Sequence, residues 1–411
     1  MLKSTLIWIG LRISMQRFLG KKIILGVCGG VAAYKAVELA RSLQQSGAQV
    51  QVVMTVTAQD FIGAQTFQAV TGFPVWIDTN DCSFERSMAH IDLSRWADLI
   101  LVAPATANFM AKLAHGFGDD LLSLVCMMAQ KPILVCPAMN VNMWQNVATQ
   151  ANYECLKQRG IIFIGPDAGP QACGDVGFGR MREPEYILNA LDVYPTYQSL
   201  QGQSFVITAG PTREPIDPVR YISNQSSGLM GFSLAEVLAF AGAEVTLIAG
   251  PTHLSCPPDV TCIQVETAQQ MRDEVFACLK EGDCFIGVAA VCDFLIAKPQ
   301  TQKIKKNAGL ALNLELIAAP DILSEVKKSR IANKVIGFAA ETDNLVVYAQ
   351  QKLQQKADMI IANIVGHQRV FGQANSALTV ITNDAMLELP EQSKIQLSAR
   401  LTEIFKVFLQ D

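Results

Sequence analysis

A glycine-rich segment of the chain carries residues that could handle a thiol. Cys173 lies in the run ACGDVGFGRM (172–181), with Asp175 and Arg180 close by in the sequence. This polar setting differs from that of a core cysteine, and the Arg180 cation would favour the thiolate over the thiol. Glycines at 174, 177 and 179 would let the segment fold over a bound substrate as a lid.

Two further polar residues could act on the same substrate. His90, in SMAHIDLSRW, is expected at the start of a helix, and an imidazole can move a proton near neutral pH. Asn140 follows an apolar run and offers an amide that can hold a carboxylate without neutralising it. From the residues alone, a capping or surface histidine and a satisfied strand-end asparagine stay open as alternatives.

Two groups of lysines could surround a triphosphate. The run Lys303-Ile304-Lys305-Lys306 would place Lys303 and Lys305 on one face of a strand, although a solvated strand edge explains the same run. Lys352 and Lys356 are four residues apart, so one face of a helix could present both.

Two strand–turn–helix–strand units must position these groups. The first covers 21–55 and the second 204–251, and each turn is rich in glycine. The pattern is that of the mononucleotide-binding half of a doubly wound sheet, where backbone N–H groups at a helix N-terminus meet a phosphate. Neither turn is a complete G-x-G-x-x-G, so the turns alone leave a nucleotide or flavin site undecided.

The remaining segments continue the alternation of strands and helices that is typical of a parallel α/β sheet. We predict two Rossmann-like α/β domains and place the boundary within 192–203, where the sequence is polar and lacks a period. Predicted segments of the first half are strands at 99–103, 133–136 and 161–164, helices at 61–70, 107–128 and 147–158, and a loop at 165–182. Those of the second half are apolar strands at 284–290, 335–338 and 359–362, a hairpin at 377–381 and 386–389, and a final helix at 394–408.

The composition excludes several classes of protein. The chain has 411 residues, of which 50% are hydrophobic and 17% charged, enough for two or three domains with buried strands. Its net charge of −4 and the lack of a large basic block argue against nucleic acid. The 11 cysteines form no C-x-x-C pair, which favours reduced thiols and a cytoplasmic location.

The first 20 residues differ from the rest. The apolar run 6–11 is too short to span a bilayer, and no cleavage site follows it, so we expect neither an anchor nor a signal peptide. Residues 1–20 are interpreted as a disordered extension or a mis-assigned start, with Met15 as the true initiator.

The motifs of both halves together resemble a known family. Residues 103–108 (APATAN), 137–140 (PAMN) and 172–181, with Gly29-Gly30 and His90, resemble the flavin-dependent cysteine decarboxylases. The loop 209–228 (AGPTREPIDPVRYISNQSSG) resembles that of phosphopantothenoylcysteine synthetase. Their order is similar to that of the bacterial bifunctional phosphopantothenate–cysteine ligase and phosphopantothenoylcysteine decarboxylases of coenzyme A synthesis.

For the first half, the resemblance implies a decarboxylase domain over 21–195 that works as a trimer. His90 would be the base, Asn140 would orient the carboxylate, and Cys173 would act in the reduction of the enethiol. Arg180 and Met181 would bind substrate. The resemblance places FMN at Gly29, Gly30, Thr55, Thr106 and Asn108. In place of Cys28 the family usually has Thr or Ser, so a hydroxyl contact to the flavin phosphate would be lost.

For the second half, the resemblance implies a CTP-dependent ligase domain over 196–411 that pairs as a dimer. Arg220 and Asn224 would bind the acyl-cytidylate, and Mg²⁺ would accompany CTP, with its protein ligands unassigned. The positions that match CTP contacts are Asp293, Lys303, Pro320, Asp321, Ile322, Leu323, Phe338, Lys352 and Lys356. Leu229 and Cys292 depart from the usual Lys and Ala of the family.

Three alternatives compete with this interpretation. A regulatory binding protein would share the flavoprotein half, but the intact Cys173 segment and the second half argue against it. A dinucleotide-dependent oxidoreductase would need an acidic residue directly after a second strand, and neither 50–57 nor 245–251 has one. A flavin prenyltransferase would have no use for Cys173 or for a CTP domain.

Overall fold

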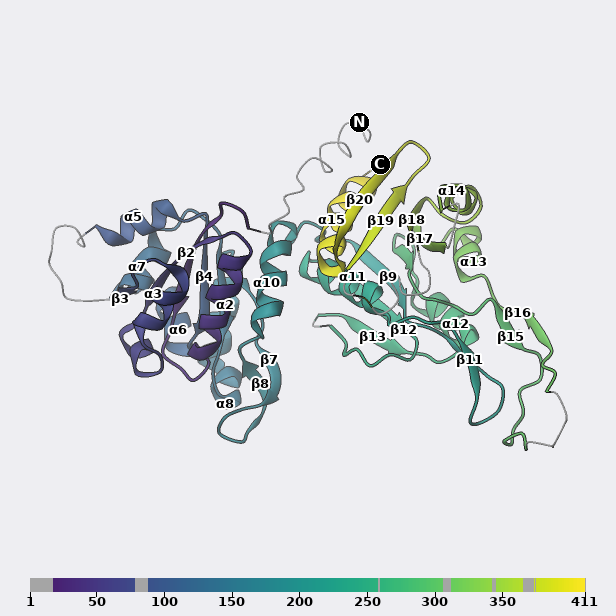
Figure 1. Ribbon diagram of the computed structural model, residues 1–411, viewed down its shortest axis with the longest axis horizontal. Helices are drawn as coiled ribbons and strands as arrows, with labels where there is room; N and C mark the ends of the chain where they lie inside the picture. Colours follow the sequence, from purple (N-terminus) through teal and green to yellow (C-terminus); the bar gives the residue numbers. More distant parts are fainter. Residues whose placement is uncertain are drawn as a thin grey trace. The chain divides into compact units, whose positions relative to one another are not determined.

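The structure is a computed structural model that describes residues 18–77, 88–257, 259–305, 312–341, 345–364, 373 and 375–410. These residues divide between Asp192 and Val193 into two compact units (Figure 1). Most of the expected N-terminal extension, residues 78–87 and Lys306 lie outside the described residues. Both units are α/β, so the predicted fold class is confirmed.

The first unit is built on a six-stranded parallel sheet. Its order is β3-β2-β1-β4-β5-β6, so the winding direction reverses between β1 and β4. This is the doubly wound arrangement that the first glycine turn predicts, and ligands of such sheets bind at the reversal, outside the carboxyl ends of the strands. The strands are β1 (Lys22–Val27), β2 (Gln49–Met54), β3 (Trp76–Ile77), β4 (Leu99–Ala105), β5 (Ile133–Pro137) and β6 (Ile162–Phe163).

Every residue of the central strand β4 is buried, as expected for a parallel sheet that is covered on both faces. The covering helices use their apolar faces; α2, for example, buries Ala36, Leu39 and Leu43. The helices of this unit are α2 (Ala33–Gln45), η1 (Val56–Asp60), α3 (Ala64–Thr71), α5 (Ala89–Trp96), α6 (Ala107–His115), α7 (Leu121–Met128), α8 (Val141–Gln145), α9 (Val147–Gln158) and α10 (Pro184–Val193).

Two predictions for the first unit are wrong. The expected single helix at 107–128 is two helices, because Gly116 ends α6 in the left-handed conformation and Asp120 starts α7 with a capping box. The expected loop at 165–182 contains an antiparallel hairpin of β7 (Asp167–Pro170) and β8 (Val176–Arg180). Helix α9 begins and ends as predicted.

The second unit is built on an eight-stranded sheet of order β13-β12-β9-β14-β17-β18-β19-β20. Pairing is parallel from β13 to β18 and antiparallel from β18 to β20. The strands are β9 (Ser204–Ala209), β12 (Glu244–Ala249), β13 (Thr261–Gln264), β14 (Cys284–Gly287), β17 (Lys334–Glu341), β18 (Met359–Ile364), β19 (Asn375–Ile381) and β20 (Met386–Ser393). The predicted final hairpin is therefore confirmed, and the predicted final helix is present as α15 (Lys394–Phe408).

Two hydrophobic clusters hold this second sheet between helices. One cluster joins α11 and α15 to the sheet through residues such as Phe232, Leu238 and Leu401. The other joins α12, α13 and α14 through residues such as Val275 and Val326. The helices are α11 (Leu229–Phe240), α12 (Ala268–Cys278), α13 (Ile322–Ser329), α14 (Leu345–Lys356) and α15 (Lys394–Phe408), with η2 (Tyr194–Thr196) near the start of the unit.

Two small hairpins extend from the second sheet: β10 (Arg213–Pro215) with β11 (Tyr221–Ser223), and β15 (Phe294–Ile296) with β16 (Leu316–Ala318) (Figure 1). Lys303–Lys305 have no regular structure, so the strand expected there is wrong. The expectation of reduced thiols is wrong for one pair, because Cys256 and Cys262 form a disulfide. Among the described residues, no helix is long and apolar enough to cross a membrane.

Candidate active sites

Four turns meet at the carboxyl edge of the first sheet. Gly29 follows β1, Thr55 follows β2, Thr106 follows β4 and Asn140 follows β5. A side chain at Gly29 would have its Cβ 2.6 Å from Thr57 Oγ1, so only glycine lets the first two turns approach this closely. The Thr55 and Thr57 hydroxyls lie 3.3 Å apart beside this turn. The predicted cofactor residues therefore share one edge.

The N-terminus of α6 lies at the same edge. The Thr106 hydroxyl caps the helix by accepting a hydrogen bond from the Phe109 N–H at 3.2 Å, and Asn108 is exposed in the first turn. His90 is the second residue of α5, so it lies at the start of a helix as predicted, and it is half-buried. Helix α5 precedes β4 and runs antiparallel to it, so the first turn of α5 also lies at the carboxyl edge of the sheet.

Glycines bring the β7–β8 hairpin onto the loop that follows β5. A Cβ at Gly177 would lie 2.5 Å from the Val141 side chain, and one at Gly179, with φ of +141°, would overlap the Met139 carbonyl oxygen. The close approach allows the Met139 N–H to donate to the Gly179 carbonyl at 2.9 Å. Two of the three glycines that suggested a lid, Gly177 and Gly179, therefore serve to dock a hairpin.

The docked hairpin places Cys173 against Asn140. The Asn140 side-chain amide donates to Cys173 Sγ at 3.2 Å and to Asp175 Oδ2 at 2.7 Å, and the thiol itself lies 3.4 Å from Asp175 Oδ2. The Asn140 side-chain oxygen caps α8 by accepting from the Asn142 N–H at 2.8 Å. Hydrogen bonds from Asn140 and then Cys173 lower the pKa of Asp175. Two of the predicted catalytic residues are thus in contact.

Arg180 has a different neighbour from the one expected. Its guanidinium lies 3.4 Å from Glu183 Oε1, whereas the thiol contacts described above involve Asp175 and Asn140. The same Glu183 oxygen accepts from Lys35 Nζ at 2.6 Å, and Lys35 also donates to the Met181 carbonyl at 3.2 Å. Lys35 is 7% exposed.

Sequence reasoning missed Lys35, which ties the predicted substrate segment to helix α2. A signal was present, since Lys35 stands among the apolar residues of a predicted core-facing helix, where an unpaired cation is costly. Cys28, where the family usually has Thr or Ser, is 1% exposed, and burial raises the pKa of its thiol to about 12. Its side chain therefore faces the core, and the expected loss of a phosphate contact stays a prediction.

In the second unit, a buried carboxylate joins two segments of the predicted ligase site. Asp217 accepts from the Arg220 guanidinium, from the backbone N–H groups of Val219 and Arg220 at 2.9 Å, and from the Ile304 N–H at 3.1 Å. Arg220 also donates to the Ile304 carbonyl at 3.0 Å. These hydrogen bonds hold the pKa of Asp217 well below its usual range, and the one from Arg220 is the largest cause. Lys303, which is exposed, is thereby held beside the Arg220 turn.

Asn224 bridges the long loop after β9 to the loop after β14. Its side-chain amide donates to the Ala290 carbonyl at 3.2 Å and the Val291 carbonyl at 3.0 Å. Asp293 follows on the same loop and is exposed, and its carbonyl accepts from the Ala319 N–H at 2.9 Å. Hydrogen bonds thus link Asn224 to the loop that carries Asp293, and link Asp293 to the residue before the 320–323 segment.

The 320–323 segment forms the N-terminus of α13. The Asp321 carboxylate caps this helix by accepting from the Ser324 N–H at 3.1 Å, and its other oxygen accepts from Lys356 Nζ at 2.5 Å. A Cβ at Gly337 would lie 2.7 Å from the Leu323 side chain, so the glycine beside Phe338 lets α13 pack closely on the sheet. Pro320 and Ile322 flank the cap, and Ile322 is buried.

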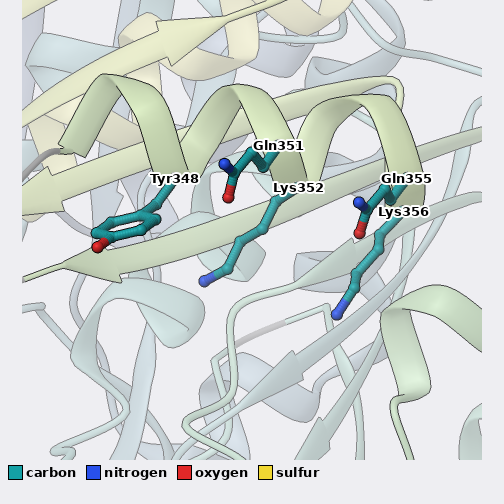
Figure 2. Close-up of a pocket in the computed structure, with 5 residues that line it drawn as sticks. All are labelled: Tyr348, Gln351, Lys352, Gln355 and Lys356. Carbon is teal, nitrogen blue, oxygen red and sulfur yellow. The ribbon is translucent and has the colours of Figure 1, made fainter.

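Lys352 and Lys356 lie on one face of α14, as predicted (Figure 2). With Tyr348, Gln351 and Gln355 they line a shallow pocket of ≈ 280 Å³. Figure 2 shows both ammonium groups extending from the helix toward the same side. Among the residues that the structure describes, no cluster of three or more His, Cys, Asp or Glu side chains could hold a metal ion.

Comparisons with known proteins agree with this two-unit geometry. The Flavoprotein family model matches residues 12–193, and the model for the DNA/pantothenate metabolism flavoprotein C-terminal domain matches residues 200–407. The chain therefore belongs to the class of proteins in which an α/β flavoprotein unit is joined to a pantothenate-metabolism unit.

The coenzyme A biosynthesis bifunctional protein CoaBC of Haemophilus influenzae is 46% identical over 93% of this chain and 96% of its own length. CoaBC of Escherichia coli (strain K12) is 45% identical over 91% of this chain and 94% of its own length. A crystal structure of the C-terminal domain of a CoaBC is 38% identical, with a TM-score of 0.45, and covers 52% of this chain and 99% of that domain. The chain belongs to the CoaBC family of bifunctional enzymes of coenzyme A biosynthesis.

Proposed function

We propose that the two units carry out successive steps. The second unit joins 4′-phosphopantothenate to cysteine at the expense of CTP, and the first unit decarboxylates the resulting phosphopantothenoylcysteine to 4′-phosphopantetheine. The observation that carries the decarboxylase assignment is the 3.2 Å contact between Asn140 and Cys173, which places a carboxylate-binding amide beside a thiol at the ligand edge of a doubly wound sheet.

The carboxyl edge of the first sheet suits FMN. Gly29 has no side chain and lies close to Thr57, which leaves a cradle for a phosphate, and the hydroxyls of Thr55 and Thr57 offer it donors. Thr106 and Asn108 lie on the neighbouring turn. When bound, FMN supplies an acceptor for two electrons from the cysteinyl thiol and later returns them. Membership of residues 12–193 in the Flavoprotein family supports a flavin at this edge.

The decarboxylase roles follow from the groups at this edge. His90 takes the proton of the substrate thiol, and Asn140 holds the carboxylate until it leaves as CO₂. Cys173 returns a proton to the enethiol, and Arg180 and Met181 bind the rest of the substrate. The Lys35–Glu183 pair supports this last segment, because Lys35 also donates to the Met181 carbonyl.

The ligase roles centre on charge. The phosphopantothenate carboxylate attacks the α-phosphorus of CTP and releases pyrophosphate; the cysteine amine then attacks the acyl carbon and releases CMP. Lys303, Lys352 and Lys356 would balance the triphosphate, and Arg220 and Asn224 would hold the acyl-cytidylate. Mg²⁺ would arrive with CTP, with Asp293 as a nearby exposed carboxylate. Lys356 would exchange its Asp321 partner for a phosphate oxygen.

Assembly and location stay predictions. Trimers through the first unit and dimers through the second are expected from the family, and so is a cytoplasmic location. The exposed apolar residues of the β15–β16 hairpin support a protein contact there, since Phe294 is 56% and Ile317 49% exposed.

The test is mass spectrometry of the products formed from 4′-phosphopantothenate, cysteine, CTP and Mg²⁺ by the flavin-loaded protein. Both activities together predict 4′-phosphopantetheine and CMP. Phosphopantothenoylcysteine alone would leave the ligase and remove the decarboxylase. No turnover by folded protein would favour a regulatory binding protein of the same fold.

A further inference from the structure

The hydrogen bonds of Asn140 are all in use within the protein. An asparagine side chain has two N–H donors and one carbonyl oxygen. The Asn140 nitrogen donates to Cys173 Sγ at 3.2 Å and to Asp175 Oδ2 at 2.7 Å, and the Asn140 oxygen caps α8. A substrate carboxylate can therefore reach this amide only by displacing a residue of the hairpin tip.

Asp175 carries the same chemical group as the part of the substrate that Asn140 is proposed to hold. Both are carboxylates, and the Asp175 oxygen makes the shorter of the two contacts with the amide. Asp175 is exposed and lies in the tight turn at the hairpin tip, where the Gln171 N–H donates to the Asp175 carbonyl at 2.8 Å. We propose that Asp175 is an internal stand-in for the substrate carboxylate, which the substrate displaces on binding and which returns to Asn140 after CO₂ has left.

This exchange would order the two halves of the decarboxylase reaction, and it rests on the proposed function. Cys173 is two residues from Asp175 and its thiol contacts the same oxygen, so the two side chains move together. While the substrate carboxylate holds Asn140, the thiol is kept from the amide. Once the carboxylate has left, Asp175 and Cys173 return to the position seen here, and the thiol arrives beside the decarboxylated product. Asp175 is thus a positioning residue whose effect passes through Asn140.

A pair of unreactive ligands isolates the exchange. 4′-Phosphopantothenoylserine has a hydroxyl in place of the thiol, and 4′-phosphopantothenoylethanolamine differs from it only by lacking the carboxylate. Calorimetric titration of the full-length, flavin-loaded protein gives the affinity for each. In Asp175→Ala we expect the serine ligand to bind about three- to tenfold more tightly, the net scale of one ordinary hydrogen bond regained. The ethanolamine ligand should change less than about twofold on the same scale.

A double-mutant cycle separates displacement from simple repulsion between two carboxylates. In an Asn140→Ala background, loss of Asp175 should no longer tighten the serine ligand, because there is no amide to compete for. Asp175→Asn, which is neutral but keeps an acceptor oxygen, should give a smaller gain than Asp175→Ala. Glu185→Ala, which removes an exposed carboxylate from the start of α10, is the matched control and should show no gain.

The outcomes distinguish the two levels of the argument. An equal gain in the Asn140→Ala background, or none in Asp175→Ala, would overturn the stand-in role and leave the decarboxylase assignment intact. Failure of the unaltered protein to bind either ligand would overturn the proposed function and this inference with it. As a second readout, single turnovers of Asp175→Ala should release CO₂ well before product forms, so that the decarboxylated intermediate accumulates.

Discussion

Single charged side chains set the shape of both sites. In the first unit, Lys35 on α2 is 7% exposed and donates to the carbonyl of Met181, a proposed substrate-binding residue, and to the Glu183 carboxylate. Lys35 is the buried member of this pair, and removing its ammonium group leaves the Met181 carbonyl without that donor. The ammonium group therefore fixes where the chain leaves the hairpin.

We expect Lys35→Met to loosen this segment while keeping the apolar stem. The KM for phosphopantothenoylcysteine should rise about tenfold, with a smaller change in kcat, because a positioning contact for the substrate is lost. Steady-state kinetics of the decarboxylation step measure this. Lys131→Met, at an exposed position before β5, is the control. A fall in kcat with unchanged KM would contradict the positioning role.

Asp217 gives a prediction about pH in the second unit. Its pKa is lowered on folding, chiefly by Arg220, so its stabilising effect is present above the ordinary aspartate value of about 4 and is lost as the pH falls toward the folded value. Asp217→Asn should therefore speed hydrogen exchange at 213–223 and 300–305 at pH 7. The difference from the unaltered protein should shrink below about pH 4, where the carboxylate of the opened segment begins to protonate while the native carboxylate stays charged. A difference that is constant with pH would refute the ion-pair role.

At the scale of elements, docking of the β7–β8 hairpin depends on glycine. Gly179→Ala would place a Cβ on the Met139 carbonyl at a φ of +141°, so the hairpin must shift away from Asn140. We expect kcat/KM for decarboxylation to fall at least about tenfold, and ligation to be unaffected. Both rates can be followed in one assay of CO₂ and pyrophosphate. Gly63→Ala, where the added atom meets nothing within 4 Å, should leave both rates unchanged.

The elements also show what sequence reasoning could and could not reach. Glycine turns, apolar runs and the lysine spacing of α14 are local signals, and they gave the sheet class, α9, α15 and the face of Lys352 and Lys356. The end of α6 at Gly116 could have been predicted from the sequence, since a glycine followed by an aspartate cap is a local signal that one helix ends and another begins.

The contacts that define the sites were out of reach for a different reason. Asn140 meets Asp175 across 35 residues, and Asp217 meets Ile304 across 87. Such pairs depend on how irregular loops close in space, which no periodicity encodes. The strand expected at Lys303 is absent for the same reason: Asp217 accepts from the Ile304 N–H and so holds this segment in an irregular conformation.

At the scale of the whole molecule, each unit has a core of its own, and three of the four tryptophans, Trp76, Trp96 and Trp144, belong to the first unit. Since no tryptophan follows Asp192, fluorescence should report chiefly the unfolding of the first unit. FMN at about 100 times its Kd should stabilise that transition by about 2.7 kcal/mol, and CTP should leave it unchanged while raising a calorimetric transition of the second unit. Equal shifts of the fluorescence transition by both ligands would contradict separate unfolding.

The division between Asp192 and Val193 joins two folding units in one polypeptide. Ribosomes therefore make both activities in equal numbers, and a protease that attacks either unfolded half removes the other with it. A substitution that merely destabilises one unit should lower the cellular yield of both steps, although the purified protein would show a defect in only one. Inherited defects in this chain should thus fall into two groups: those that lower abundance and affect both steps, and site lesions such as those at Asn140, which affect one.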